Sequence, residues 1–476
     1  MSPGRKSMTS RCTPCLRESR RTRDRKKSTG GPRAIGKAGS SKHIRRIVAG
    51  FGPFEPAVMS DTFWSASKIA VGLGVHIRRQ IHPCQLGANT TIGARNMSAY
   101  ITATGSFLPG APVPNEEIED YIGKAGRSTS DLKEITLANC GIKTRHYAID
   151  KAQNTLMSNA AMAASAVRVA ADRAGLGPDD VELLCAATTQ PDLMTPGHAS
   201  MVHGELGFGP LEIATMHGVC SSGMMALKNA YLQVAIGEKR NAISTASEFA
   251  SRFFKNTRYA EMGATAEQGS LPLEAAFLRY MLSDGAGAAV VEREPAASGI
   301  SLRIDWISLT SYANTKQACM YGGSSDTSCT KAWADYPTVS EAAADGAMVL
   351  RQDLSLLPHL VSIGVDEYER LRQLGKFDPA TLTWMPAHYS SERMKTSVVE
   401  EFSRRGLEGV RPELWWSNLT SVGNIGSASI YVILDEMLSQ GLISEGDTLL
   451  CMVPESGRFA VSFMHLTAVT SAGTHR

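Results

Sequence analysis

The sequence predicts an α/β protein built from two similar halves, with mixed sheets sandwiched between helices. Strand-like and helix-like segments alternate from residue 97 to residue 467. A strand-to-helix junction at Cys220 recurs at Asn424, and a glycine-containing turn at 284–286 recurs at 455–458. The recurrence is one of pattern and not of identity, and it indicates duplicated βαβ units. We expect a first half over 97–295, a second half over 296–467 and a tail over 468–476.

The first half opens with a short strand and then alternates helices with apolar strands. Asn115–Ile122 begins a helix, and Met157–Ala174 is an alanine-rich helix that Gly175 ends. Short apolar runs bounded by turn residues are typical of central strands. We therefore expect strands at Tyr100–Thr104, Val181–Thr188, Leu211–Val219 (a buried one), Asn241–Ser247 and within Leu282–Glu292.

The second half begins near Ile300 and follows the same plan. A strand at Leu382–Ala387 leads to His388, and Leu414–Val422 leads into a helix at Ser427–Leu438. The last two strands are expected at Asp447–Val453 and Phe459–Met464, joined by the PESGR turn.

Residues 1–96 differ in composition from the rest of the chain. Residues 1–46 contain 15 Lys and Arg against Glu18 and Asp24, a net +13, so the total of +3 leaves −10 for the remainder. This Arg-, Ser- and Gly-rich composition predicts disorder. The segment could be a nucleic-acid or membrane-surface tail, a transit peptide, or no functional part, with the real start at Met97. We favour the last, because the regular pattern begins abruptly there.

Composition excludes several functional classes. Nine scattered cysteines without a signal peptide favour a reducing compartment, so we expect a cytoplasmic protein without a disulfide framework. Cys12 and Cys15 have no second pair at zinc-finger distance, and no metal site is expected. No apolar run approaches about 18 residues, which argues against a membrane span. The acidic globular part gives no basis for nucleic-acid binding, and no nucleotide-binding glycine motif occurs.

Cys220 lies where an apolar run turns into a helix, in the segment HGVCSSGMMAL. Ser221, Ser222 and Gly223 are small, so the backbone can turn tightly and a substrate can approach. Unpaired N–H groups and the macrodipole at a helix N-terminus favour thiolate, the nucleophilic form. This segment alone is equally compatible with a small buried hydrophobic cysteine.

His388 and Asn424 are also expected directly after strands, where sites form in α/β sheets. Taken singly, the histidine could be structural and the asparagine could cap the helix that follows it. Together with Cys220 they supply a soft nucleophile and two hydrogen-bond donors. Acyl-thioester chemistry needs that set, because a developing enolate or oxyanion must be stabilised.

Six segments match one family: GIKTRHYA (141–148), ATTQPDLMTP (187–196), GVCSSGMMAL (218–227), SDGAGAAVV (283–291), the His388 loop and GNIGSASI (423–430). The three that contain Cys220, His388 and Asn424 also follow in the order and at the spacing of the family. Residues 97 to about 467 thus resemble the β-ketoacyl-ACP synthase III group of the thiolase superfamily. The resemblance implies a thiolase-like α-β-α-β-α fold and a homodimer. It also implies that Cys220 accepts an acyl group and that His388 and Asn424 polarise the second thioester. The implied oxyanion hole consists of the backbone N–H groups of Cys220 and Gly457.

The chain departs from this family at three places. The PESGR turn surrounds Gly457 with Glu455, Ser456 and Arg458, where the family usually has a run of glycines. After Asp131 the chain has Leu132 and not the tryptophan that stacks on the adenine of coenzyme A, which favours acyl carrier protein over CoA as donor. The His388 loop reads HYSSERM, where His-Gln-Ala-Asn is more common in the family. The HYSS and PESGRF segments resemble the subgroup that makes dialkylresorcinol precursors, in which a β-ketoacyl and an unsaturated acyl thioester are joined and cyclised.

Other residues are candidates for smaller roles. Glu248 could be an accessory base near the pocket, although a solvated or dimer-face carboxylate is the simpler interpretation. Glu455 is a second possible accessory group. Arg252, Lys255 and Arg258 could dock an acidic carrier protein or could form an ordinary solvated face.

The sequence therefore predicts an enzyme that joins two acyl thioesters by Claisen-type condensation through an acyl-Cys220 intermediate, in fatty acid, polyketide or dialkylresorcinol-type biosynthesis. Its expected partners are acyl carrier protein or CoA thioesters, with no cofactor. Two alternatives are acyl transfer to an oxygen or nitrogen nucleophile and a non-catalytic heterodimer partner. The presence of both His388 and Asn424 favours condensation over simple transfer, and the presence of Cys220 disfavours the non-catalytic partner.

Overall fold

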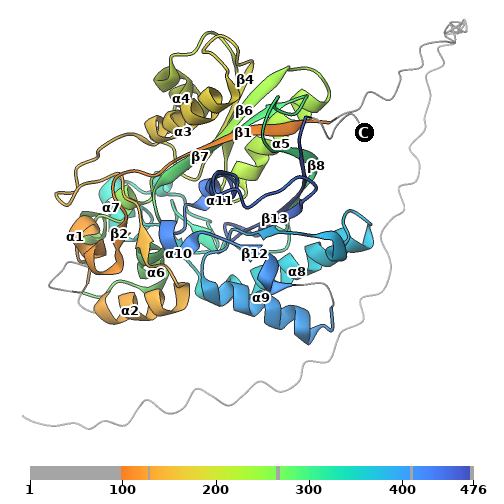
Figure 1. The fold of residues 1–476 in the computed structure, drawn as a ribbon. Coiled ribbons are helices and arrows are strands. Elements are labelled where there is room, and N and C mark those ends of the chain that lie inside the picture. The colour runs from red at the N-terminus through yellow and green to blue at the C-terminus, as the bar shows by residue number, and fades with distance from the viewer. Residues whose placement is uncertain (1–97, 127–128, 264–268, 408–410, 472–476) are drawn as a thin grey trace, which may run out of the picture. The chain divides into compact units, whose positions relative to one another are not determined.

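The computed structural model describes residues 98–126, 129–263, 269–407 and 411–471 (Figure 1). The disorder predicted for residues 1–96 lies outside the described residues.

Five strands from the first half form one sheet. Its central pairs β1–β7 and β7–β6 are antiparallel, and β6–β4 and β4–β5 are parallel. In spatial order the strands are β1 (Tyr100–Phe107), β7 (Gly285–Glu292), β6 (Asn241–Glu248), β4 (Leu183–Thr188) and β5 (Glu212–His217).

The second half repeats this sheet strand for strand. In equivalent spatial order its strands are β8 (Ser301–Ser311), β14 (Ala460–Val469), β13 (Thr448–Glu455), β11 (Met385–Pro386) and β12 (Trp415–Trp416). The first two pairs are antiparallel, parallel bridges join β11 to β13, and β11 and β12 are parallel. The predicted duplication is confirmed, since order and direction agree at every pair.

The two sheets meet along a short seam between β1 and β8. Tyr100 pairs with Arg303 and Ile101 with Leu302, in antiparallel register. The sheets are therefore continuous through this seam, which joins the first strand of each half.

Helices form three layers around the sheets, as Figure 1 shows. The helices α3 (Asn159–Ala174) and α4 (His198–Leu206) pack on the outer face of the first sheet, and α5 (Ser222–Ala235) and α11 (Ser429–Ser439) lie between the sheets. On the second sheet lies α8 (Leu357–Gln373), with α9 (Glu392–Arg404) packed against it. This is the predicted alternation of helix and sheet layers.

The ends of α3 illustrate how local sequence sets these elements. Ser158 Oγ accepts a hydrogen bond from the Ala161 N–H, which caps the first turn. Gly175 adopts a φ of 70° at the other end, a left-handed conformation that glycine takes without strain. The predicted helix thus ends at its predicted residue.

The central helix α11 is tied to the first half by a buried carboxylate. Asp435 accepts hydrogen bonds from Thr104 Oγ1 at 2.8 Å and Ser106 Oγ at 2.5 Å, both on β1, and it pairs with Arg173 of α3. These contacts hold α11, which belongs to the second half, against β1 and α3 of the first half.

Further elements flank the layers. The helices are α1 (Ile118–Ile122), α2 (Thr129–Cys140), α6 (Leu273–Met281), α7 (Val339–Ala344) and α10 (Leu419–Val422), with 3₁₀ turn η8 (Gly426–Ala428) before α11. The short strands are β2 (Val113–Pro114), β3 (Thr144–Arg145), β9 (Met320–Tyr321) and β10 (Arg351–Gln352). In the part of the chain that the structure describes, no helix is both long enough and apolar enough to span a membrane.

Three predicted strands are corrected by the structure. The strand predicted as buried over Leu211–Val219 is β5, and its side chains are mostly exposed because it pairs with β4 on one side only. The strands predicted at Leu382–Ala387 and Leu414–Val422 each shrink to two residues, β11 and β12. Residues 419–422 form helix α10 instead.

Candidate active site

Cys220, His388 and Asn424 line one cavity. Cys220 follows β5 and His388 follows β11. Asn424 comes after β12, with α10 in between. All three strands belong to the parallel part of a sheet. The carboxyl ends of such strands meet at one edge, which is why residues far apart in sequence converge. Most other wall positions are apolar: Val219, Phe249, Ala250, Leu278, Met281, Leu282, Met320, Leu350, Leu360, Met394 and Pro454.

The Asn424 side chain is oriented by its own loop. Its Oδ1 accepts the Gly426 N–H at 2.8 Å, and its backbone carbonyl accepts the Ser283 N–H at 2.8 Å. Because the amide oxygen is used within the loop, the Nδ2 donor is the end left for the cavity that Asn424 lines. The capping role and the donor role considered from sequence therefore coexist in one side chain.

His388 is a neutral donor in this environment. Its side chain is buried, and its backbone N–H donates to Met452 O at 3.0 Å across the second sheet. Burial lowers the pKa of His388 to about 4. The imidazole therefore carries one N–H at neutral pH and can donate it to a carbonyl oxygen.

The electrostatic setting of Cys220 differs from the one predicted from the helix start. Burial, and after it the carboxyl groups of Glu455 and Glu248, raise the pKa of the Cys220 thiol well above its usual value. The expected bias toward thiolate at the α5 N-terminus is therefore wrong for the free protein. The physical reason is that a dry site and two acids outweigh the helix end.

Glu248 is a buried carboxyl in the cavity wall and not a solvated one. It ends β6 with 7% exposure. Its Oε1 accepts from Ser427 Oγ at 2.5 Å and Thr189 Oγ1 at 2.7 Å, and backbone N–H groups of both residues also point to it. Burial raises the pKa of Glu248 to about 7. Ser427 and Thr189 could not be identified from the sequence, because their partner Glu248 is 179 and 59 positions away from them in the chain.

The late turn brings Glu455 against the Cys220 turn and Ser456 to the cavity wall. Glu455 Oε2 accepts the Ser221 N–H at 2.9 Å, and burial raises the pKa of this carboxyl. Ser456 lines the cavity, whereas Gly457 is not among its described lining residues. A Cβ at Gly457 would lie 2.9 Å from Val219 Cγ2, so a glycine is needed there for close packing.

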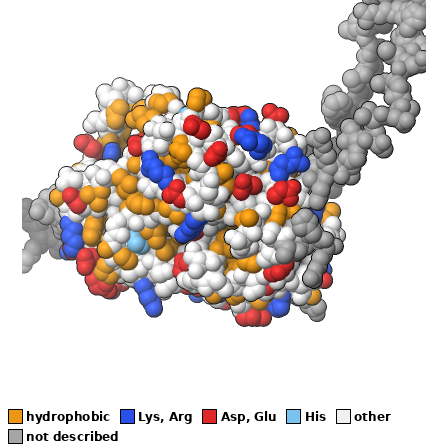
Figure 2. Space-filling model, turned by 45° about the horizontal axis from the view of Figure 1, so that its top comes forward, with side chains coloured by type: hydrophobic (Ala, Val, Ile, Leu, Met, Phe, Trp, Pro, Cys, Tyr) orange, Lys and Arg blue, Asp and Glu red, His pale blue; other side chains and the backbone are white. Residues whose placement is uncertain are grey.

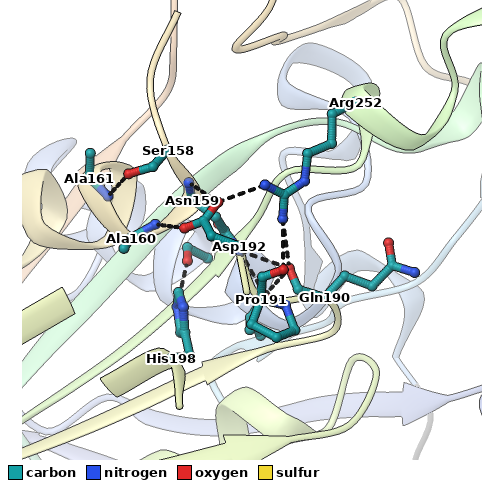
Figure 3. A network of polar contacts seen from close by, with 11 residues as sticks. Ser158, Asn159, Ala160, Ala161, Gln190, Pro191, Asp192, His198 and Arg252 are labelled. Atoms are coloured by element: carbon teal, nitrogen blue, oxygen red, sulfur yellow. Dashed lines mark hydrogen bonds and ion pairs between the residues drawn. The ribbon is translucent and has the colours of Figure 1, made fainter. Parts of the chain in front are cut away.

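Arg252 braces the loop between β4 and α4, as Figure 3 shows. Its guanidinium pairs with Asp192 at 2.6 Å and donates to the carbonyl groups of Gln190 and Pro191 at 3.2 and 3.0 Å. Asp192 in turn accepts the first N–H groups of α3, from Asn159 and Ala160. Arg252 is thus a loop brace with 17% side-chain exposure, and not a docking side chain.

The other two predicted docking residues lie nearby. Lys255 is half-buried and donates to Gln153 O at 2.6 Å, whereas Arg258 is exposed. Of the predicted trio, Arg258 is the residue classed as exposed, and Arg252 and Lys255 are partly buried.

A second apolar cavity adjoins the first and was not predicted. The two share Leu360, Met394 and Pro454 as walls, and the second extends between α8 and α9 to Tyr368, Phe402 and Trp415. Helical spacing in 357–371 could have predicted the apolar face of α8. No sequence signal could place α9 opposite it. No cluster of metal-ligating side chains occurs among the described residues.

Comparisons with known proteins agree with this architecture. No protein-family model matches the chain. Among solved structures, the tetronic acid condensing enzyme AbyA1 superposes with a TM-score of 0.61 at 21% identity, over 78% of this chain and 99% of that one. The 3-oxoacyl-[acyl-carrier-protein] synthase III of Aquifex aeolicus gives 0.58 at 18% identity, with the same coverage.

Xanthomonas campestris OleA, solved as a variant with bound lauric acid and lauroyl-CoA, gives a TM-score of 0.60 at 16% identity, over 78% of this chain and 99% of that one. Each of these three proteins is covered over 99% of its length. The chain therefore has the thiolase-like fold of these condensing enzymes.

Proposed function

We propose that this protein is an acyl-condensing enzyme that forms a carbon–carbon bond between two acyl thioesters. The observation that carries the proposal is the meeting of Cys220, His388 and Asn424 in one largely apolar cavity. A thiol, two neutral hydrogen-bond donors and dry walls are what thioester condensation requires.

In the first half-reaction, Cys220 sulfur attacks the donor's thioester carbonyl. The carrier thiolate leaves and takes up the proton lost by Cys220, so an acyl-Cys220 thioester and a free carrier thiol are formed. No net charge enters the apolar cavity, which suits the raised pKa of this thiol.

In the second half-reaction, the donors of His388 and Asn424 polarise the carbonyl of the second thioester. The second thioester then loses CO₂, or loses an α-proton to the Glu248 carboxylate in the cavity wall, and forms an enolate whose oxygen accepts both hydrogen bonds. The enolate carbon attacks acyl-Cys220 and the Cys220 thiolate leaves. The thiolate regains a proton from Glu248 or, after loss of CO₂, from water, so the thiol is restored. A neutral imidazole suits the donor role of His388 because it donates without first losing a proton.

Acyl transfer to an oxygen or nitrogen nucleophile needs no enolate and would leave the Asn424 donor without a role. A non-catalytic partner would have no use for Cys220. Condensation is the proposal in which all three cavity residues act.

The second cavity favours a product with two alkyl chains, of the dialkylresorcinol-precursor kind. Its walls are apolar, and it is separated from the Cys220 cavity by Leu360, Met394 and Pro454. One cavity can hold the chain on Cys220 while the other holds the tail of the second thioester. Substituting Gly364, on the wall of the second cavity, by Phe should shorten the accepted second chain without changing the first.

The proposed donor is an acyl carrier protein. The face drawn in Figure 2 has Lys and Arg side chains interspersed with Asp and Glu, without a continuous basic field. Exposed Arg258 is the remaining candidate contact, and its charge reversal should raise KM for the carrier-bound donor in a salt-sensitive way.

We also propose that the protein is a homodimer that pairs through β5. Its outer edge is unpaired in the described chain, and Ile213 on it is 40% exposed. Leu232 and Ile236, in and just after α5, expose further apolar surface at 45% and 61%. An open strand edge with adjacent apolar groups suits pairing with a second copy.

Intact-mass analysis of the purified protein with a panel of acyl carrier protein and CoA donors tests the function. We expect a single acyl adduct that disappears when an acceptor thioester is added and a condensed product forms. An adduct that hydrolyses or moves to an amine or alcohol, with no carbon–carbon product, would contradict condensation.

A further inference from the structure

Glu455 is a buried acid for which the proposed chemistry has no use. It is the last residue of β13, and its Oε2 accepts the N–H of Ser221, the residue between Cys220 and helix α5. The carboxyl is enclosed by two turns: a Cβ on Gly457 would lie 3.3 Å from Oε1, and one on Gly218 would lie 3.9 Å from Oε2. It therefore lies against the backbone that carries the candidate nucleophile.

A free helix start would activate a cysteine at this position. Its unpaired N–H groups and the positive end of the macrodipole stabilise thiolate. Here one of those N–H groups is occupied by the Glu455 carboxyl, and the backbone of Val219 contributes to holding it as well. When ionised, the carboxylate adds a negative charge where a thiolate would need a positive one.

We propose that Glu455 is a positioning residue that holds the Cys220 turn and keeps the thiol protonated in the free protein. Resting on the proposed role of Cys220, the inference adds that Cys220 gives up its proton only as it attacks a bound thioester. Its proton passes to the departing carrier thiolate, so the step needs no external base and leaves the cavity uncharged.

Three titratable groups face Cys220, each from a different element. Glu455 comes from β13, Glu248 from β6 and His388 from the loop after β11. His388 is neutral, because its pKa is lowered to about 4. The charge of Glu248 is shared with hydroxyl and N–H donors of Thr189 and Ser427. Arg458, in the same turn as Glu455, donates instead to Lys316 O at 2.9 Å.

The test is the pH dependence of Cys220 alkylation by iodoacetamide, followed on the full chain by peptide mass spectrometry. In the wild type we expect the midpoint above that of an ordinary thiol, about 8.5. Glu455→Gln keeps the size and an acceptor oxygen for Ser221 but removes the charge. We expect its midpoint to fall by about one pH unit or more, so that alkylation below the midpoint is roughly tenfold faster.

Glu445→Gln is the matched control, because Glu445 lies just before the opposite end of β13 and is exposed. Its profile should equal that of the wild type. An unchanged midpoint in Glu455→Gln would assign Glu455 a structural role only, and an equal shift in the control would make the effect a general one of charge.

If Glu455→Gln does not fold, the pH profile of Cys220 alkylation in the wild type can still overturn the proposal. A midpoint at or below that of an ordinary thiol overturns the proposal. Alkylation needs no acyl substrate, so a protein that forms no acyl adduct with any donor would refute the proposed function and leave this result standing.

Discussion

In each half one strand, β5 or β12, leads to the cavity that Cys220 and Asn424 line, but the chain continues differently after these two strands. Strand β5 passes through Cys220 directly into α5, whereas β12 is followed by α10, Asn424 and η8 before α11 begins. The direct junction puts a thiol at a helix start. The longer one gives Asn424 a loop whose Gly426 N–H holds the amide oxygen. One topology thus yields the candidate nucleophile in one half and a candidate hydrogen-bond donor in the other.

The strands β6 and β13, which occupy equivalent places in the two halves, correspond more closely. Strand β6 ends at Glu248 and β13 ends at Glu455, and each carboxyl crosses to the opposite half. Glu248 accepts from Ser427 before α11, and Glu455 accepts from Ser221 before α5. The duplication of the fold therefore explains why each half has a buried glutamate that accepts hydrogen bonds from the other half. Their difference is that two hydroxyl groups bond Glu248, and a backbone N–H of the Cys220 turn bonds Glu455.

The largest expected effect comes from removing the Cys220 thiol at the junction between β5 and α5. Cys220→Ala should neither gain acyl mass nor condense substrates, because no other cysteine in the described part of the chain lines this cavity. Its melting temperature should stay near that of the wild type, since a small side chain replaces another. Intact mass and a peptide map measure this, and an acyl group on Cys185 or Cys319 would contradict the assignment.

Removing a donor from the second half should separate the two half-reactions. His388→Ala or Asn424→Ala should leave acylation of Cys220 largely intact and slow condensation by about a hundredfold or more, the usual scale for one oxyanion-type donor. Single-turnover acylation and product formation are to be measured separately. Equal losses in both steps would mean that these residues orient Cys220.

The exposed β5 edge, absent from its short counterpart β12, gives a smaller effect. Ile213→Lys should shift the protein from dimer to monomer in light scattering, because a buried lysine would oppose pairing. Leu374→Lys is the control, since Leu374 is 59% exposed after α8 and away from this edge. An unchanged mass for Ile213→Lys, or a monomeric wild type, would contradict pairing through β5.

The smallest effect concerns the pH dependence of stability at Glu248. Burial raises its pKa to about 7, against about 4.3 for an unfolded glutamate. The favourable contribution of its protonated form is complete below about pH 4.3 and is lost as pH rises through about 7. The melting temperature of Glu248→Gln relative to the wild type should therefore rise between about pH 5 and about pH 8. Glu445→Gln should show no such trend, and a pH-independent difference would refute the assigned ionisation.

Much of the fold and the main candidate site could be predicted from the sequence. Local signals are strong where a glycine or a cap ends a helix, as at Gly175 and Ser158 of α3. Apolar runs predicted β4 and β6, and the strand-to-helix pattern predicted that the halves correspond. Cys220, His388 and Asn424 could be selected from the sequence because each was expected after a strand, and strand ends share one edge of a sheet. In the structure α10 separates Asn424 from β12.

Only the tertiary structure decided the environment of those residues. Composition could not tell that β5 lies at an edge, that Arg252 pairs with Asp192, or that Glu248 and Glu455 are buried and accept hydrogen bonds from the opposite half. Such contacts join residues 60 to 234 positions apart in the chain. Periodicity and caps report only on neighbours within a few turns, whereas burial and charge depend on which distant segments pack together. The candidate reactive residues are therefore visible in the sequence, but their protonation states are a property of the packed fold.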